Sequence, residues 1–161
     1  MCPTLCRLPW FNQVAQIKDS IYSAIFDSDG TTLIDTLLIE DGEVKNLYGS
    51  HQMASYLNMK ETGDLKCAKL RGGSLDINKL DKYIEIVSMS GLQTDLRNDY
   101  IGGEVRLAIL HDGNKEIPIT GFSISGSLKE NLNNLQLSNN IVRVDRYEGP
   151  DLLKLSKISI A

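Results

Sequence analysis

Cysteine and histidine are the residues of this sequence that can bind a transition metal. The chain has three cysteines, Cys2, Cys6 and Cys67, and two histidines, His51 and His111. Cys2 and Cys6 lie four residues apart and are suitable for half of a zinc site, but the other three residues are scattered along the chain. A structural zinc site requires four such ligands held close together. We therefore expect no metal site and no bound cofactor.

An acidic turn follows the first apolar run of the chain, and its spacing suggests phosphoester chemistry. After Ile21–Phe26 the sequence is Asp27-Ser28-Asp29-Gly30-Thr31. An apolar strand followed by D-x-D-G-T resembles the first motif of haloacid-dehalogenase-type phosphatases. That resemblance implies that Asp27 would be the nucleophile and that Asp29 would be a general acid and a metal partner.

Three features of the sequence argue against the phosphatase interpretation. Two threonines, Thr31 and Thr32, replace the single threonine of that motif, and no later acidic pair that could hold Mg²⁺ is evident. The later strands are joined by hairpin turns, whereas that mechanism uses a parallel sheet with long crossovers. We favour an acidic turn whose aspartates bind local amides and whose Gly30 adopts a positive φ. The phosphatase remains an alternative.

Two glycines, Gly102 and Gly103, directly precede the apolar segment Glu104–Leu110. Glycine within a strand lets another backbone come close, so an extended peptide could pair with a sheet edge here. Glycines inside strands more often mark a bulge that bends a long strand. We retain Gly102 and Gly103 as candidate peptide-edge glycines beside that structural interpretation.

The elements that would position these residues are predicted from turn and cap chemistry. Asp112-Gly113 separates Glu104–Leu110 from an apolar segment over 116–124, and Asp41-Gly42 separates segments over 32–39 and 44–48; both dipeptides favour hairpin turns. Ser127 and Glu130 match a capping box at the start of a helix over 127–135, and Ser50 is suited to cap a helix over 50–59. Further strands are expected over 65–70, 83–89, 141–144 and 152–160. The predicted fold class is β-rich α+β, with antiparallel sheets built from hairpins and two short helices.

Two blocks of the sequence resemble the PmbA/TldD family, the so-called modulators of DNA gyrase, which includes metal-dependent peptidases. The matching positions of the first block are Phe26 to Gly30, Ile39 to Gly42, Tyr48, Ser50, Ala54, Leu57 and Thr62-Gly63. Those of the second block are Ile109, Asp112-Gly113, Pro118, Ile124 to Gly126, Ser127-Leu128 and Asn140 to Val142. The resemblance implies a C-terminal domain of this family over 21–161, preceded by a lead-in over 1–20.

The peptidase members of the family carry an H-E-x-x-x-H zinc helix upstream of this domain and a late cysteine ligand. Neither histidine of this sequence is followed by glutamate, and the segment where the late cysteine would fall reads Asp145-Arg146-Tyr147-Glu148-Gly149. We therefore expect a non-catalytic module that binds a peptide or a partner. The alternatives are one half of a zinc peptidase that a partner chain completes, or the phosphatase that uses Asp27 and Asp29.

The composition and net charge of the chain limit the classes of partner that it can bind. The net charge of −4 argues against a nucleic-acid backbone as partner, which requires clustered lysine and arginine. No apolar run approaches about 20 residues, so we expect no membrane span and a cytoplasmic location. The resemblance implies two-subunit assemblies, so we expect either a homodimer or a TldD-like partner chain. A strand over Tyr83–Met89 is a candidate edge for that pairing.

Overall fold

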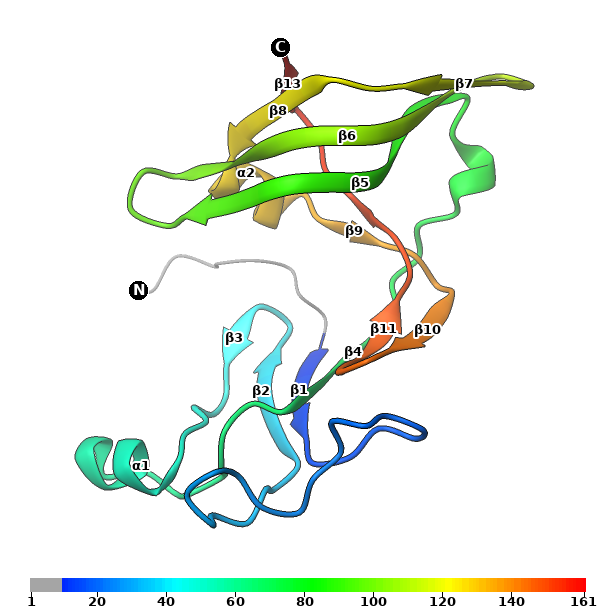
Figure 1. Ribbon diagram of the computed structural model, residues 1–161. Helices are drawn as coiled ribbons and strands as arrows, with labels where there is room; N and C mark the ends of the chain where they lie inside the picture. The colour runs from blue at the N-terminus through cyan, green and yellow to red at the C-terminus, as the bar shows by residue number, and fades with distance from the viewer. Residues whose placement is uncertain (1–9) are drawn as a thin grey trace. The chain divides into compact units, whose positions relative to one another are not determined.

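The computed structural model describes residues 10–161, which form two compact units. The first unit contains the chain up to Leu75 together with Gln136–Leu153, and the second contains Asp76–Leu135 and Lys154–Ala161. Figure 1 shows the strands and helices of both units, most of them with labels. The chain therefore crosses from one unit to the other three times.

A six-stranded sheet forms the first unit. Its order is β10-β11-β4-β1-β2-β3. All neighbouring strands are antiparallel except β11 and β4, which are parallel. The strands are β1 (Trp10–Val14), β2 (Thr36–Glu40), β3 (Glu43–Val44), β4 (Cys67–Leu70), β10 (Ile141–Val144) and β11 (Tyr147–Pro150).

Strand β1 lies in the middle of this sheet, between β2 and β4. It belongs to the segment 1–20, for which the sequence predicted a lead-in. Its inclusion follows from its side chains, since Val14 and Ile17 are buried with Cys67 of β4, and Tyr22 packs against this cluster. Burial of such side chains against a neighbouring strand is the main driving force for docking a segment into a sheet.

The predicted turn at Asp41-Gly42 joins β2 to β3. Asp41 has a φ of 50° and Gly42 a φ of 80°, the two left-handed conformations that a tight hairpin turn requires. Both strands are shorter than the sequence predicted. The amide of Leu33 donates to the carbonyl of Ile25 and that of Ile34 to the carbonyl of Thr62, so these residues belong to a loop rather than to β2.

Helix α1 (His51–Leu57) starts where the sequence predicted, after Ser50. The Ser50 side chain accepts no cap hydrogen bond. The helix ends earlier than predicted because Asn58 adopts the left-handed conformation, with a φ of 51°. Ala54 is the one buried residue of α1.

The second unit is built on a five-stranded antiparallel sheet. Its order is β13-β8-β6-β5, and β7 also pairs with β6. Its core is formed by Val105, Ala108 and Ile124, which are buried together. The strands are β5 (Lys82–Asp95), β6 (Tyr100–Asp112), β7 (Lys115–Ile119), β8 (Phe122–Ser127) and β13 (Ser159–Ile160).

The predicted Asp112-Gly113 turn joins β6 to β7, and Gly113 has a φ of 60°. The segment 116–124, predicted as one strand, is interrupted at Gly121, which has a φ of 74°. As a result β7 pairs with one half of β6, from Ala108 to Asp112, and β8 pairs with the other, from Tyr100 to Val105.

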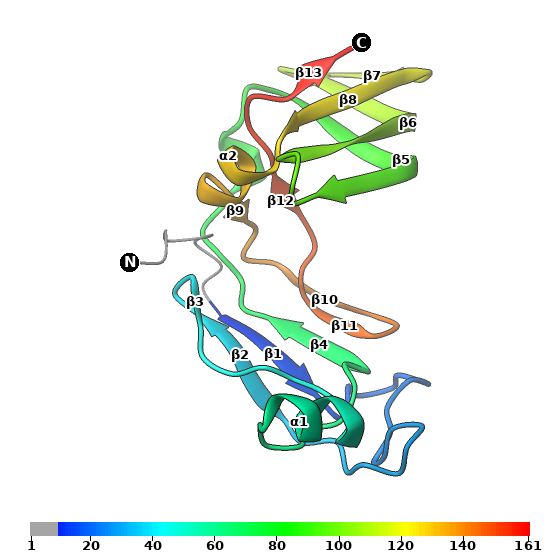
Figure 2. The ribbon, with the colours of Figure 1, turned by 90° about the vertical axis from the view of Figure 1, so that its left-hand side faces the viewer.

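Helix α2 (Leu128–Asn133) follows β8, and Figure 2 shows it beside the end of that strand. The Ser127 hydroxyl accepts a hydrogen bond from the Glu130 amide (3.0 Å), which is one half of the predicted capping box. The other half is absent, because the Glu130 carboxylate pairs with Lys157 instead. None of the described helices has the length and apolar character that crossing a membrane requires.

The strand predicted over 152–160 is broken in two. Strand β12 (Leu153–Lys154) pairs with β9 (Gln136–Leu137), and β13 pairs with β8. A single 3-10 turn, η1 (Ile77–Lys79), precedes β5. The predicted β-rich α+β fold with hairpins and two short helices is confirmed.

Candidate functional site

Strand β5 presents the longest open edge of the second unit. It has fourteen residues, pairs with β6 along one side, and stands at the end of the strand order. The register to β6 is regular from Lys82 to Ile86 and then shifts between Ile86 and Met89 and between Ser90 and Gln93. Each shift is a bulge, which bends a strand and increases its twist. The regular part of the edge is therefore five residues long.

Gly102 and Gly103 do not form a free edge, so the peptide-edge interpretation of these two glycines is corrected. Both lie in β6, which is paired on its two sides: Gly102 stands opposite Gln93 of β5 and Ser125 of β8. The bulge interpretation fits better. The bulged residues Gly91 and Leu92 stand beside Gly103, and a Cβ on Gly103 would lie 3.0 Å from the Leu92 Cα. The open edge is one strand away, on β5.

One face of the β5–β6 pair carries a stacked aromatic pair. The Tyr83 ring lies on the His111 ring, with centroids 4.3 Å apart and an interplanar angle of 12°. His111 Nε2 contacts Glu85 Oε2 at 3.0 Å, and Nδ1 lies 3.8 Å from Glu116 Oε1. Burial raises the pKa of Tyr83, and the carboxylates of Glu85 and Glu116 raise it further. Both ring nitrogens of His111 thus face carboxylates within this sheet.

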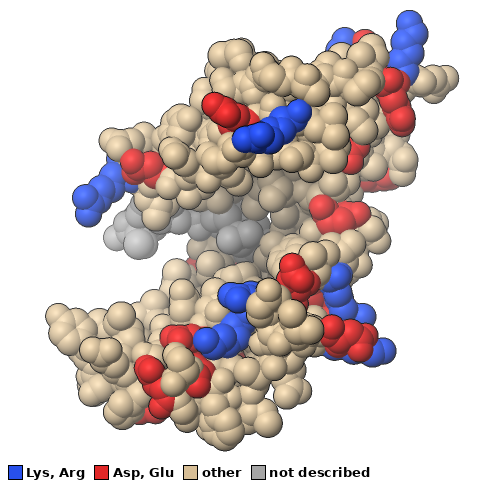
Figure 3. Space-filling view, in the orientation of Figure 1, with Lys and Arg blue, Asp and Glu red and all other residues tan. Residues whose placement is uncertain are grey.

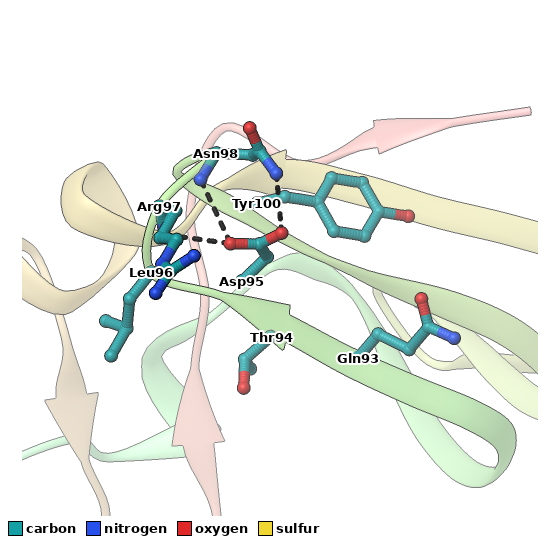
Figure 4. Close-up of a pocket in the computed structure, with 7 residues that line it drawn as sticks. All are labelled: Gln93, Thr94, Asp95, Leu96, Arg97, Asn98 and Tyr100. Carbon is teal, nitrogen blue, oxygen red and sulfur yellow. Dashed lines mark hydrogen bonds between the residues drawn. The ribbon is translucent and has the colours of Figure 1, made fainter.

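The turn that joins β5 to β6 borders an open concavity of about 780 Å³, shown in Figure 4. Asp95 fixes this turn, because its carboxylate accepts from the amides of Arg97 (2.8 Å) and Asn98 (3.0 Å) and from Asn98 Nδ2 (2.6 Å). The hydrogen bonds from Asn98 and Arg97 hold the pKa of Asp95 below its ordinary value. The residues that line the concavity are Gln93, Thr94, Asp95, Leu96, Arg97, Asn98 and Tyr100.

Asp99, at the end of the same turn, fixes the start of α2. Its carboxylate accepts from the Lys129 amide (2.7 Å) and from the Ser127 hydroxyl (2.8 Å). The Lys129 amide, and then the Ser127 hydroxyl, lower the pKa of Asp99. No local pattern in the sequence predicts this contact, since the residues are about 30 positions apart. These two hydrogen bonds hold the turn of the β5–β6 hairpin against the start of α2.

Asp27 holds its own loop together in the first unit. Its Oδ1 accepts from the amides of Asp29 and Thr31, both at 2.9 Å, and its Oδ2 accepts from the Asp64 amide at 3.3 Å. Gly30 has a φ of 80°, as the acidic-turn interpretation requires. Burial raises the pKa of Asp27, but the hydrogen bonds from Thr31, Asp29 and Asp64 outweigh it and the pKa is lowered. Both carboxylate oxygens thus have a structural role.

Replacing Asp27 by asparagine is expected to destabilise the protein without changing any turnover. The lowered pKa means that the charged carboxylate stabilises the fold above the ordinary pKa of 3.8, and that this contribution disappears as the pH falls through the lower folded-state value. Thermal unfolding at neutral pH should show a decrease of several degrees for Asp27→Asn. The exposed Asp29 is the control, and Asp29→Asn should unfold as the wild type does. Mg²⁺-dependent phosphoester hydrolysis that Asp27→Asn abolishes would establish a phosphatase instead.

The other candidate metal ligands lie apart from one another. Cys67 is buried beside Val14, and burial raises the pKa of its thiol, the opposite of what a thiolate ligand needs. His51 Nδ1 pairs with Glu61 Oε1 at 2.7 Å. Within residues 10–161 no three histidine, cysteine, aspartate or glutamate side chains are grouped to hold a metal ion. Cys2 and Cys6 lie outside the described residues.

An ion-pair network occupies the turn where the late cysteine of the peptidases would fall. Glu148 of β11 accepts from Arg143 Nε (2.7 Å) and lies 3.4 Å from Lys69 Nζ. The Arg143 hydrogen bond lowers the pKa of Glu148. Next to it, the Arg146 guanidinium stacks over the Tyr22 ring at 4.1 Å. These side chains stabilise the β10–β11 turn against β4.

Comparisons with solved structures identify the fold. The chain resembles a candidate modulator of DNA gyrase from Thermotoga maritima (TM-score 0.77, 14% identity), with 98% of this chain and 40% of that chain covered. It also resembles a candidate modulator of DNA gyrase from Bacteroides thetaiotaomicron (TM-score 0.77, 13% identity), with 98% of this chain and 37% of that chain covered. A third similar structure is TldE from Thermococcus kodakarensis (TM-score 0.78, 17% identity), with 98% of this chain and 40% of that chain covered. The chain therefore spans about two-fifths of the length of these structures.

No curated protein matches the chain significantly. The family described as the PmbA/TldA metallopeptidase C-terminal domain matches residues 12–161. This range covers nearly the whole sequence and includes the last three residues of β1, Asn12 to Val14. The chain therefore belongs to the PmbA/TldA metallopeptidase C-terminal domain family.

Proposed function

We propose that this chain is a non-catalytic module of the PmbA/TldD type that binds an extended polypeptide along the open edge of β5. The single observation that carries the proposal is this edge, since β5 pairs with β6 on one side and with no described strand on the other. A free strand edge offers a row of backbone amides and carbonyls to an incoming strand. The bound polypeptide is a peptide or a segment of a partner chain.

The side chains of β5 support strand addition. The segment Lys82–Ile86 has two charged residues, and both are engaged with β6: Lys82 pairs with Asp112 at 2.7 Å, and Glu85 contacts His111 at 3.0 Å. Proteins that avoid pairing at an edge place free charges or proline there, and β5 has no proline. Because bulges follow Ile86, the incoming strand pairs mainly with Lys82–Ile86.

The surroundings of the candidate zinc ligands support a module that binds a polypeptide rather than one that cleaves it. A zinc hydrolase needs three protein ligands and a general base. Cys67 is buried, and His51 and His111 are each paired with carboxylates elsewhere. Glu148 is held by Arg143 and Lys69, so its carboxylate already has two cationic partners.

The second candidate function is one half of a zinc peptidase that a partner chain completes. The observation that favours it is the coverage, because the similar structures are about two and a half times as long as the matched region. Purified chain alone, and the chain co-purified with a protein that carries an H-E-x-x-x-H helix, should be compared for zinc content and peptide hydrolysis. Zinc-dependent hydrolysis by the pair alone would establish this second function.

Replacing Val87 by lysine is expected to weaken peptide binding at least tenfold. Val87 is 52% exposed on the edge strand and directly follows Lys82–Ile86, so a lysine there places a charge at the end of the segment with which the incoming strand pairs. The probe is a fluorescein-labelled peptide of alternating valine and threonine, and the measurement is fluorescence anisotropy.

The matched control is Leu107→Lys. Leu107 is also exposed, at 38%, but lies in β6, opposite Ser88 of β5 and one strand away from the open edge. This variant should bind the probe like the wild type. Equal loss in the two variants, or no binding by the wild type, would contradict a peptide site at the β5 edge.

A further inference from the structure

The two faces of β5 differ in what they offer to a strand that pairs along its open edge. Successive side chains of a strand point to opposite faces of the sheet. Ile84 packs against the buried core of the second sheet, so its neighbours Tyr83 and Glu85 lie on the other face, which we call the outer face. The side chains of an incoming strand alternate in the same way. Every second one is therefore placed beside Tyr83 and Glu85.

The outer face carries two carboxylates around His111. Glu85 Oε2 lies 3.0 Å from His111 Nε2, and Glu116 Oε1 lies 3.8 Å from Nδ1. Within residues 10–161, neither glutamate forms an ion pair with a lysine or an arginine. A neutral imidazole balances no charge, and a protonated one balances only one of the two carboxylates. A net negative charge therefore remains beside the open edge in both forms of His111.

The lysines nearest in the chain belong to the opposite face. Lys82 and Lys115 both stand opposite Asp112 in the register, and Lys82 pairs with it at 2.7 Å. Because they are the neighbours of Tyr83 and Glu116 in sequence, alternation points them away from the outer face. Figure 3 shows acidic and basic side chains together at the end of the second unit that holds the β6–β7 turn. The register thus separates the two signs onto different faces of the sheet.

The carboxylates of the outer face are accessible to a ligand. The Glu116 side chain is 71% exposed and that of Glu85 is 37% exposed. Their negative charge also acts on Tyr83, since they add to the effect of burial in raising the pKa of its phenol.

We propose that the β5 edge selects an extended polypeptide that places a lysine or arginine side chain beside Tyr83 and Glu85. This inference rests on the peptide site proposed above and adds its selectivity. Opposite charges on neighbouring strands favour pairing by up to about fivefold, and like charges oppose it. A glutamate in the same position of the peptide would be repelled by both Glu85 and Glu116.

The test compares two forms of the valine–threonine probe, with the central threonine replaced by lysine or by glutamate. Fluorescence anisotropy at low salt should show that the wild type binds the lysine probe about tenfold more tightly than the glutamate probe. A protein with both Glu85→Gln and Glu116→Gln should bind the two probes about equally. Because the result is a ratio, a general loss of affinity cancels. In about 1 M salt, where charges are screened beyond ~3 Å, the wild-type ratio should also approach one.

Single variants provide a control with matched charge. Glu116→Gln changes an exposed side chain outside β5 and should reduce the ratio to about threefold. Glu104→Gln removes one negative charge as well, but Glu104 is exposed in β6 opposite Ser90, beyond the first bulges of β5. This control should keep the wild-type ratio.

Three outcomes would overturn the proposal. Equal binding of the lysine and glutamate probes by a wild type that still binds the valine–threonine probe would remove the selectivity and leave the peptide site. Equal effects of Glu104→Gln and Glu116→Gln would assign the preference to the net charge of the chain. Failure of all three probes to bind would remove the peptide site together with its selectivity.

Discussion

Replacing Ile124 by alanine is expected to lower the free energy of unfolding by about 2–5 kcal/mol. Ile124 is 5% exposed and is buried with Val105 and Ala108 of β6, the strand on which the whole second sheet is assembled. Removing its side chain leaves a cavity that strands fixed by hydrogen bonds cannot close. The loss therefore includes both the transfer free energy of the removed atoms and the cost of the cavity.

Ile117 provides a control with the same chemistry in the same unit. It lies in β7 and is 45% exposed, so Ile117→Ala should change the free energy of unfolding by about 0.5 kcal/mol or less. Urea denaturation followed by far-ultraviolet circular dichroism measures both variants. Equal losses for Ile124→Ala and Ile117→Ala would show that Val105, Ala108 and Ile124 do not form the core of this sheet.

Local chemistry made the turns and helix starts predictable from the sequence. The Asp41-Gly42 and Asp112-Gly113 hairpins depend on residues that accept a positive φ, and both turns lie where the sequence places them. The start of α2 follows from the Ser127 hydroxyl on the Glu130 amide, a contact within four residues of sequence. The family resemblance rests on the order of these same local features.

Contacts between distant residues were not predictable in the same way. The position of β1 depends on pairing with β2 and β4, which lie more than twenty residues away in the chain. The parallel pair β11–β4 joins segments nearly eighty residues apart. The Asp99 contact with the start of α2 likewise has no local pattern, because an aspartate in a turn has many equivalent uses.

The same difference between local patterns and contacts of distant residues applies to the candidate site. The sequence identified Tyr83–Met89 as a possible edge strand, and the strand order places β5 at the end of its sheet. It assigned the peptide edge to Gly102 and Gly103, because two glycines in a strand look alike whether they admit a ligand or a neighbouring strand. Only the pairing of β6 on both sides distinguishes these cases.

Replacing Gly102 by alanine is expected to lower the free energy of unfolding by about 1–3 kcal/mol. A Cβ at this position would lie 2.6 Å from the Ile124 carbonyl oxygen and 2.4 Å from the Tyr100 hydroxyl oxygen. The tyrosine ring, which covers the glycine from two residues earlier, can rotate away. The carbonyl cannot, because it belongs to the backbone of β8, so β6 and β8 must separate locally.

Making Gly102→Ala in a Tyr100→Ala protein tests the contact with the Ile124 carbonyl without the contact with the Tyr100 hydroxyl. Measuring peptide binding then tests whether Gly102 also has a role in function. In that background Gly102→Ala should still be destabilising, since the Ile124 carbonyl remains. Peptide affinity, measured below the unfolding transition with the valine–threonine probe, should stay at the wild-type level because the open edge is on β5. If Gly102→Ala is as stable as the wild type but no longer binds the peptide, the binding site lies at Gly102 and Gly103, and the proposed site on β5 is wrong.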